Sequence, residues 1–140
     1  MKQKLEYLSI STKGPGLIEI TELINPILEN SEITNGLLTI YSTHTSASLL
    51  IQENADPDVQ FDIKAYFQRM VPEDERLYLH QSEGSDDMPA HIKSALTQTS
   101  LSIPISDKKM TVGQWQGIYL FEHRKAPHVR RLVVHIIGET

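Results

Sequence analysis

The sequence contains no cysteine. This absence excludes a disulfide framework, a thiolate metal site and a cysteine nucleophile, and nothing in the chain requires an oxidising compartment. Long apolar runs are also missing, because no stretch approaches the roughly 20 apolar residues that span a bilayer. The N-terminal segment Met1–Tyr7 lacks the apolar region of a secretion signal. We therefore expect a soluble, cytoplasmic protein that does not enter a membrane.

Positive charge is scarce as well. The chain has 13 basic and 18 acidic residues, a net charge of -5, which argues against a general binder of nucleic-acid backbones. A local basic cluster at Arg124–Lys125 and Arg130–Arg131 could still hold one anionic ligand. A length of 140 residues corresponds to about one domain. No linker, repeat or low-complexity tract divides it, so residues 1–140 are expected to form a single domain.

Five segments have the residue pattern of β-strands. Alternating side chains predict strands at Lys4–Ser11 and Leu37–His44. β-Branched and aromatic residues predict further strands at Leu101–Ile105, Thr111–Glu122 and Val129–Gly138. Most of these strands lie near the two ends of the chain.

Helical patterns occupy the segments between these strands. Thr21 is expected to cap a helix over residues 22–30. Residues 56–71 carry apolar side chains at three- and four-residue spacing, typical of an amphipathic helix packed on the core. A third helix is expected to begin near Asp86 or Asp87, with Pro89 in its first turn. Together these elements predict an α+β fold: an antiparallel β-sandwich core with two or three flanking helices.

Imidazole, hydroxyl and acidic groups cluster after the second predicted strand. His44 opens the run His44–Ser48, and the polar run Glu53–Pro57 follows a short apolar stretch. Period-two alternation places His44 on the same strand face as Leu38 and Ile40, so its ring is expected to point inward. An inward imidazole needs a partner, which could be a carbonyl, a carboxylate or a metal ion.

Six histidines are present, but none forms a local metal-binding motif. Any metal site must therefore be assembled by the fold. His44 at a strand end, His80 before an acidic loop and His91 in the following helix could converge on a zinc ion. The alternative is that these three residues bind no metal and are hydrogen-bonded structural or surface histidines. The carboxylates that could support such a site or act as its general base are Glu53, Asp87 and Glu122.

The segment Gly113–Gly117 places Trp115 between two glutamines in what otherwise has the pattern of a strand. Glycines in a strand permit close approach of another group. Two interpretations remain open: a pocket wall that includes Trp115 and Gln116, or a bulged strand with a surface tryptophan.

Three separated blocks together resemble the YjbQ-like family, whose members are labelled secondary thiamine-phosphate synthases. The blocks are His44–Ser48 with Glu53–Pro57, then Glu83–Lys93, then Gly113–Gly117 with Glu122–Arg124. The resemblance covers nearly the whole chain. It implies a homotrimer with a β-sandwich core and a site of histidine and acidic residues near subunit contacts.

The site assignments combine this resemblance with the chemistry of the residues. Lys93, Arg130 and Arg131 are added as cations for a phosphorylated substrate. The resemblance itself carries over only the following residues: His44, Thr45, Ser46, Glu53, Asn54, His80, Asp86, Asp87, His91, Trp115, Gln116, Glu122 and Arg124. We assign metal binding to His44, His80 and His91, catalysis to Glu53, Asp87, Glu122 and Arg124, and substrate contact to Thr45, Ser46, Asn54, Lys93, Trp115, Gln116 and Arg131.

The implied activity joins a pyrimidine pyrophosphate to a thiazole phosphate and releases pyrophosphate, which requires cations or a metal to stabilise the departing charge. The leading hypothesis is a metal-assisted enzyme, with zinc or, for a pyrophosphate substrate, Mg²⁺, whose thiamine-phosphate synthase activity is weak or secondary. One alternative is a metal-dependent hydrolase of a small metabolite. Another is a non-catalytic trimeric protein that binds a small molecule against Trp115.

Overall fold

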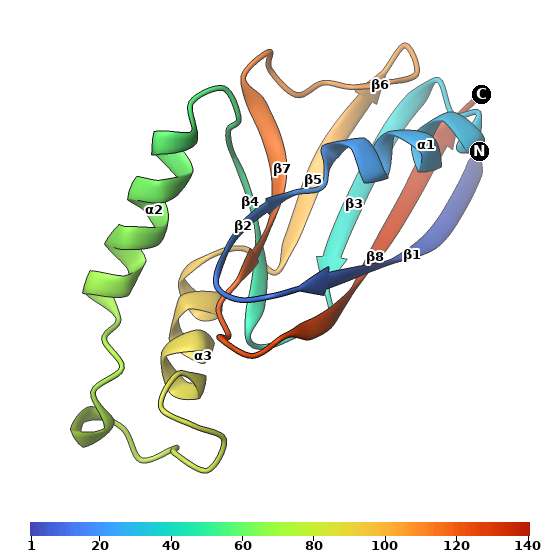
Figure 1. Cartoon of the computed structure of the whole chain (residues 1–140). Helices are drawn as coiled ribbons and strands as arrows, with labels where there is room; N and C mark the ends of the chain where they lie inside the picture. The colour runs from blue at the N-terminus through green and yellow to red at the C-terminus, as the bar shows by residue number, and fades with distance from the viewer.

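Two curled antiparallel sheets form the body of the protein, seen in a computed structural model that describes residues 1–140 (Figure 1). The larger sheet has the strand order β1 (Lys2–Thr12), β8 (His128–Glu139), β3 (Asn35–Ser42), β5 (Ser100–Ser106), β6 (Lys109–Met110). The smaller sheet has the order β2 (Gly16–Glu19), β7 (Gln116–Glu122), β4 (Ala47–Glu53). The helices are α1 (Thr21–Ser31), α2 (Pro57–Met70), the single 3₁₀ turn η1 (Glu75–Leu77) and α3 (Asp87–Leu96).

The hydrophobic core lies between the sheets. Burial alternates along β8, where Leu132, Val134 and Ile136 point inward. They join a core of 17 buried residues that includes side chains from both sheets and from α1. This arrangement confirms the predicted α+β class with an antiparallel β-sandwich and three flanking helices.

Helix α1 supplies Ile24 and Leu28 to the core. It begins one residue earlier than expected, because Ile20 is the N-cap and Thr21 is already helical. The Thr21 hydroxyl instead donates to Glu19 Oε2 at 2.9 Å and accepts from the Ile118 N–H at 2.9 Å. Thr21 therefore ties the helix to β2 and β7 rather than capping it.

Helix α2 stands against the smaller sheet (Figure 1). Asp56 caps it, accepting from the Asp58 N–H at 2.9 Å. None of its residues is buried, so the expectation of a core-packing helix was wrong. Its ring contact is Phe67 against Phe121 of β7, with ring centres 5.4 Å apart. This cover explains why β7 is buried on both faces.

The strand boundaries differ from the sequence prediction at two places that matter for the site. β3 ends at Ser42, so His44 lies in a loop and not on a strand. The predicted strand Thr111–Glu122 is regular only from Gln116, because Gln116 Oε1 accepts from the Gly113 N–H at 2.7 Å and closes a turn. The sequence analysis also missed β2 and β4. No helix combines the length and apolarity that crossing a membrane requires.

Candidate metal centre

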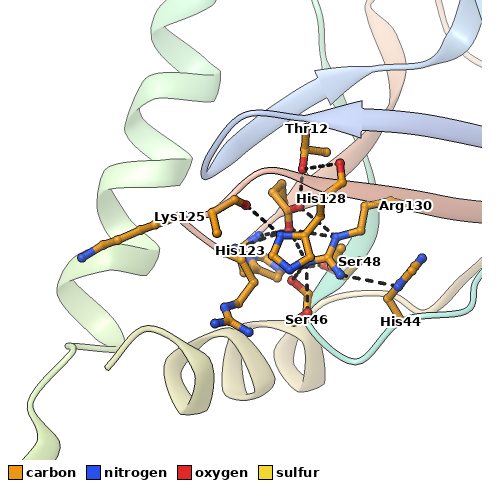
Figure 2. Close-up of polar contacts among 12 residues, drawn as sticks. Thr12, His44, Ser46, Ser48, His123, Lys125, His128 and Arg130 are labelled. Atoms are coloured by element: carbon orange, nitrogen blue, oxygen red, sulfur yellow. Dashed lines mark hydrogen bonds and ion pairs between the residues drawn. The ribbon is translucent and has the colours of Figure 1, made fainter. Parts of the chain in front are cut away.

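Polar side chains gather at the end of the sandwich where β3 ends and β4 begins. The register of the smaller sheet pairs Ala47 with Glu122, and the register of the larger sheet pairs Thr12 with His128. Helix α3 packs beside β4 at this end. Figure 2 shows the side chains that point toward one another from these strand ends and the loops between them.

Three side chains form a group with the donor atoms of a metal site. His80 Nε2 lies 2.7 Å from Asp87 Oδ2, and His91 Nε2 lies 3.3 Å from the same oxygen. Asp87 and His91 are four residues apart on α3 and so share a helix face. His80 comes from the loop after η1. One ligand atom from each of the three lies within 4.8 Å of the others.

Hydrogen bonding fixes which nitrogen of His91 carries its hydrogen. His91 Nδ1 lies 3.1 Å from the carbonyl oxygen of Thr45, which can only accept, so Nδ1 donates. The lone pair of a neutral His91 is then on Nε2 and faces the Asp87 carboxylate. Two acceptors at this distance need a proton or a metal ion between them. An Nδ1–H that donates to a backbone carbonyl is the usual arrangement of a metal-binding histidine, and two imidazoles with one carboxylate fit zinc.

Arg124 holds Asp87 in place. Its Nη1 donates to Asp87 Oδ1 at 2.6 Å, and its Nε donates to Asp86 Oδ2 at 3.1 Å. Burial raises the pKa of Asp87, but the hydrogen bond from His80 and the charge of Arg124 outweigh it and hold that pKa below its usual value. Asp87 is therefore ionised at neutral pH. Arg124 acts as a positioning residue, because its guanidinium is already bound by protein carboxylates.

A buried ion pair between Glu122 and Arg130 lies at the same end of the sandwich. Arg130 Nε donates to Glu122 Oε1 at 2.8 Å, and the Thr12 hydroxyl donates to that oxygen at 2.6 Å. The other oxygen accepts the backbone N–H groups of His123 at 3.0 Å and Arg124 at 3.3 Å. Burial raises the pKa of Glu122, but the hydrogen bonds from Arg130 and Thr12 lower it by more, so the pKa lies below its usual value. Both oxygens of Glu122 are occupied, so we assign it the positioning of Arg130 and not proton transfer.

His44 lies apart from the group of His80, Asp87 and His91. Its Nε2 accepts the Arg131 N–H at 2.8 Å, and its Nδ1 lies 3.5 Å from Arg130 Nη1 (Figure 2). Burial lowers the pKa of His44, and the charge of Arg130 lowers it further. In the structure Asp87 therefore takes the third position of the group, which the sequence analysis had assigned to His44.

A hollow of about 610 Å³ is lined by both His44 and His91. Ser94 also lines it, and its hydroxyl oxygen is buried without a hydrogen-bond partner. Hydroxyl groups of Thr43 and Thr45 add to the wall. A hollow with this polar lining beside a candidate metal group suits a small polar ligand.

Four of the predicted site residues lie at the opposite end of the smaller sheet. Glu53 pairs with Gln116, whereas Ala47 pairs with Glu122. Six residues of strand separate these pairs, a distance of about 20 Å at the usual rise per residue. The four residues at the far end are Glu53, Asn54, Trp115 and Gln116.

The far-end residues form their own contacts. The Asn54 amide donates to Glu19 Oε2 at 3.1 Å, and the Asn54 N–H donates to the Trp115 carbonyl at 2.9 Å. Trp115 is 58% exposed. Within one chain, the structure does not bring these residues to the histidines, and it favours a turn with a surface tryptophan over a pocket wall.

Three predicted substrate-contact residues differ in their exposure. Ser46 is buried, and its hydroxyl accepts from Arg130 Nη2 at 3.0 Å. Lys93 is 7% exposed, and burial lowers its pKa. Arg131 lies on the outer face of β8 with its guanidinium carbon 3.9 Å from the centre of the Tyr7 ring. None of the three presents a free charge to the hollow.

A buried pair of Ser48 and His123 was missed by the sequence analysis. Thr97 Oγ1 donates to Ser48 Oγ at 2.6 Å, and Ser48 Oγ lies 2.9 Å from His123 Nε2. His123 Nδ1 is buried and has no hydrogen-bond partner. Burial lowers the pKa of His123 to about 3, and the nearby charge of Lys93 acts in the same direction. The available signal was the two-residue spacing of Ser46 and Ser48, which is typical of one strand face.

Comparison with known proteins gives consistent matches over nearly the whole chain. The family model described as UPF0047 protein YjbQ-like matches residues 6–139. A UPF0047 protein of Synechocystis is 50% identical over 138 residues, which is 99% of this chain and 94% of that protein. The UPF0047 protein YjbQ of Escherichia coli O157:H7 is 42% identical over 94% of this chain and 96% of its own length.

Solved structures agree with this match. The crystal structure of an uncharacterized conserved YjbQ/UPF0047 family protein from Clostridium acetobutylicum has a TM-score of 0.87 at 35% identity, covering 94% of this chain and 99% of that one. A hypothetical protein from Thermus thermophilus has a TM-score of 0.84 at 29% identity, covering 94% of this chain and 99% of the other.

Proposed function

Because the chain belongs to the YjbQ-like (UPF0047) family, we propose that it is a cytoplasmic, metal-assisted enzyme acting on a small phosphorylated substrate. The observation that carries this proposal is the convergence of His80, Asp87 and His91 on one point. Three ligands from protein leave a coordination position open, which distinguishes catalytic from structural zinc sites.

The chain's own residues would hold such an ion by three atoms, His80 Nε2, Asp87 Oδ2 and His91 Nε2. This nitrogen-rich set suits zinc better than Mg²⁺, which prefers oxygen. Thr45 orients His91 through its carbonyl, and Arg124 orients Asp87. A zinc ion, when bound, polarises a phosphoryl or carbonyl oxygen and activates water.

The reaction proposed first is the one that the family resemblance implies, thiamine-phosphate synthesis from a pyrimidine pyrophosphate and a thiazole phosphate. A second candidate is hydrolysis of a phosphorylated metabolite. One observation favours hydrolysis: Arg124 and Arg130 are both held by carboxylates, and Lys93 is buried. Few free cations therefore remain to grip two phosphorylated substrates, whereas hydrolysis needs only one. The catalytic role of Glu53 stays a prediction, because Glu53 lies at the end of β4 that is far from the histidines.

Elemental analysis of the purified, untagged protein tests the metal site. We expect about one zinc per chain, and we expect His80→Ala and His91→Ala each to lower zinc affinity by about tenfold or more, because each removes a direct ligand. His44→Ala serves as the matched control and keeps its zinc, because His44 lies outside the His80–Asp87–His91 group and accepts from the Arg131 N–H instead. Absence of zinc after reconstitution, or loss from only one of the two ligand variants, contradicts the proposal.

Activity measurements on the same variants separate the two reactions. Thiamine phosphate formed with release of pyrophosphate supports the synthase, and phosphate released without a second substrate supports the hydrolase. In both cases His91→Ala is inactive. Saturable quenching of Trp115 fluorescence by a metabolite without turnover supports the non-catalytic binding protein instead.

The homotrimer is part of the same proposal. Four apolar side chains on the outer face of the larger sheet, Leu5, Tyr7, Leu37 and Tyr41, are each 40% to 53% exposed. Tyr7 and Tyr41 flank Val133 in the same row across β1, β8 and β3. Such a row supports self-association. Light scattering should give three times the 15.9 kDa chain mass, and Leu5→Lys should lower that mass; a monomeric native protein contradicts this part.

A further inference from the structure

The Nδ1 atom of His44 carries a hydrogen that has no acceptor. The backbone N–H of Arg131 donates to His44 Nε2 at 2.8 Å, so Nε2 must hold the lone pair. The hydrogen of the neutral ring is therefore on Nδ1. Its one polar contact within the chain is with Arg130 Nη1 at 3.5 Å, which is itself a donor. The two groups cannot hydrogen-bond to each other.

The Nη1 atom of Arg130 also carries hydrogens that have no acceptor. Its Nε donates to Glu122, and its Nη2 donates to Glu122 and to Ser46. A guanidinium has five N–H donors, and these contacts account for Nε and Nη2 only. The one contact of Nη1 is the His44 nitrogen. Arg130 is 3% exposed, so water reaches this group poorly.

One of these two donors, on His44, lies at the hollow beside the candidate metal group, and the other lies next to it. His44 lines the hollow, and Arg130 Nη1 lies 3.5 Å from His44 Nδ1, a contact drawn as a dashed line in Figure 2. Ser94 contributes an unpartnered hydroxyl oxygen to the wall of the hollow. His91 lines the hollow as well, so a ligand in the hollow lies next to a residue of the metal group.

We propose that His44 Nδ1 and Arg130 Nη1 bind one anionic oxygen of the substrate, from a phosphate or a carboxylate, in the hollow lined by Tyr41, His44, Ser94 and His91. Donors held by protein in a poorly hydrated place bind an anion strongly, because they need no reorganisation. This subsite rests on the proposed function in one respect: it takes the bound molecule to be the substrate of the His80–Asp87–His91 group. The substrate class is a small molecule with an anionic group beside the bond that reacts.

Two substitutions of His44 separate anion binding from a structural role. An asparagine amide nitrogen can take the place of imidazole Nδ1, so His44→Asn keeps the donor and loses the acceptor for Arg131. A glutamine side-chain oxygen can take the place of Nε2, so His44→Gln keeps that acceptor and loses the donor. The probe is inorganic phosphate, titrated by calorimetry into the full-length native protein and each variant at one pH and ionic strength.

We expect saturable phosphate binding to the native protein and, within about threefold, to His44→Asn, with His44→Gln weaker by about tenfold or more. The reverse order, with His44→Gln binding normally and His44→Asn failing, overturns the proposal, because His44 then only holds the Arg131 amide. No saturable binding to the native protein also overturns it. Competition by acetate identifies a carboxylate as the natural group, and its failure to compete identifies a phosphate.

A separate control keeps this inference distinct from the metal proposal. His80 does not line the hollow, so His80→Ala should lose zinc and still bind phosphate within about threefold of the native value. If the native protein holds no zinc but the His44 pair behaves as expected, the metal proposal fails and the anion subsite stands. If phosphate binding disappears with zinc in His80→Ala, the anion binds the ion and the subsite proposal fails.

Discussion

Acid is expected to destabilise the native protein more steeply than a His123→Gln variant. The pKa of His123 is lowered from 6.5 to about 3 by burial. Between these two values the unfolded chain binds a proton that the folded chain excludes, so stability is complete above about pH 6.5 and falls as the pH drops toward 3. The slope is about 1.4 kcal/mol per pH unit, or about 2 kcal/mol between pH 6.5 and 5.

This loss is a large share of the roughly 5 to 15 kcal/mol that stabilises an ordinary domain. Urea unfolding at pH 7, 6 and 5, with chelator present throughout, measures it. Glutamine can keep an acceptor for Ser48 but does not titrate, so the His123→Gln variant should lose less stability over this range. His44, whose pKa is also lowered, contributes equally to both proteins. His135→Gln, on the outer face of β8, is the matched control and keeps the native slope. Parallel curves for native protein and His123→Gln contradict the prediction.

The second large effect is expected from Glu122→Ala. This change leaves the Arg130 guanidinium buried without its carboxylate, which costs about 3 to 5 kcal/mol. The melting temperature should fall by about 10 °C or more for a domain of this size. Thermal unfolding followed by circular dichroism measures the change. Thr12→Val is the matched control, since it removes one hydrogen bond to the same carboxylate and should cost about 1.5 to 3 kcal/mol.

A double variant decides whether the charge is the cause. Glu122→Leu with Arg130→Met replaces both charges by apolar groups and should recover most of the lost stability. If Glu122→Ala costs no more than Thr12→Val, the ion pair is not the stabilising unit.

The pKa of Glu122 lies below its ordinary value of 4.5, so its contribution to stability is present above that pH and is lost as the pH falls below it. This loss begins at lower pH than the loss due to His123.

Local signals in the sequence predict some elements well. Asp56 before Pro57 marks the start of α2, and Pro89 marks the first turn of α3, because caps and N-terminal prolines act within a few residues. β4 was missed because it directly follows the hydroxyl-rich run Ser42–Ser46, which has the composition of a loop. β2 has only four residues, too few for an alternating pattern to be recognised.

Some residues of the site are placed by local sequence patterns, and others are placed only by long-range contacts. Asp87 and His91 are one helical turn apart, so their proximity is visible in the sequence. The place of His80 depends on a loop, and no pattern specifies it. Glu53 and Glu122 are each the last residue of a strand, yet only the antiparallel pairing of β4 with β7 places them at opposite ends of the sheet. That register joins segments more than sixty residues apart, and alternation alone does not encode it.

Helix α2 has a consequence for how the native protein moves. None of its residues belongs to the core. Its contacts with the smaller sheet include the Phe67–Phe121 ring pair and the Gln60 amide, which donates to the Glu53 carbonyl at 2.7 Å and to the Tyr119 hydroxyl at 2.9 Å. Releasing so few contacts costs less free energy than opening the sandwich. The helix can therefore detach and return while both sheets stay folded. Its amide hydrogens exchange with solvent through this local opening, whereas those of β3 and β8 exchange only when the whole molecule unfolds.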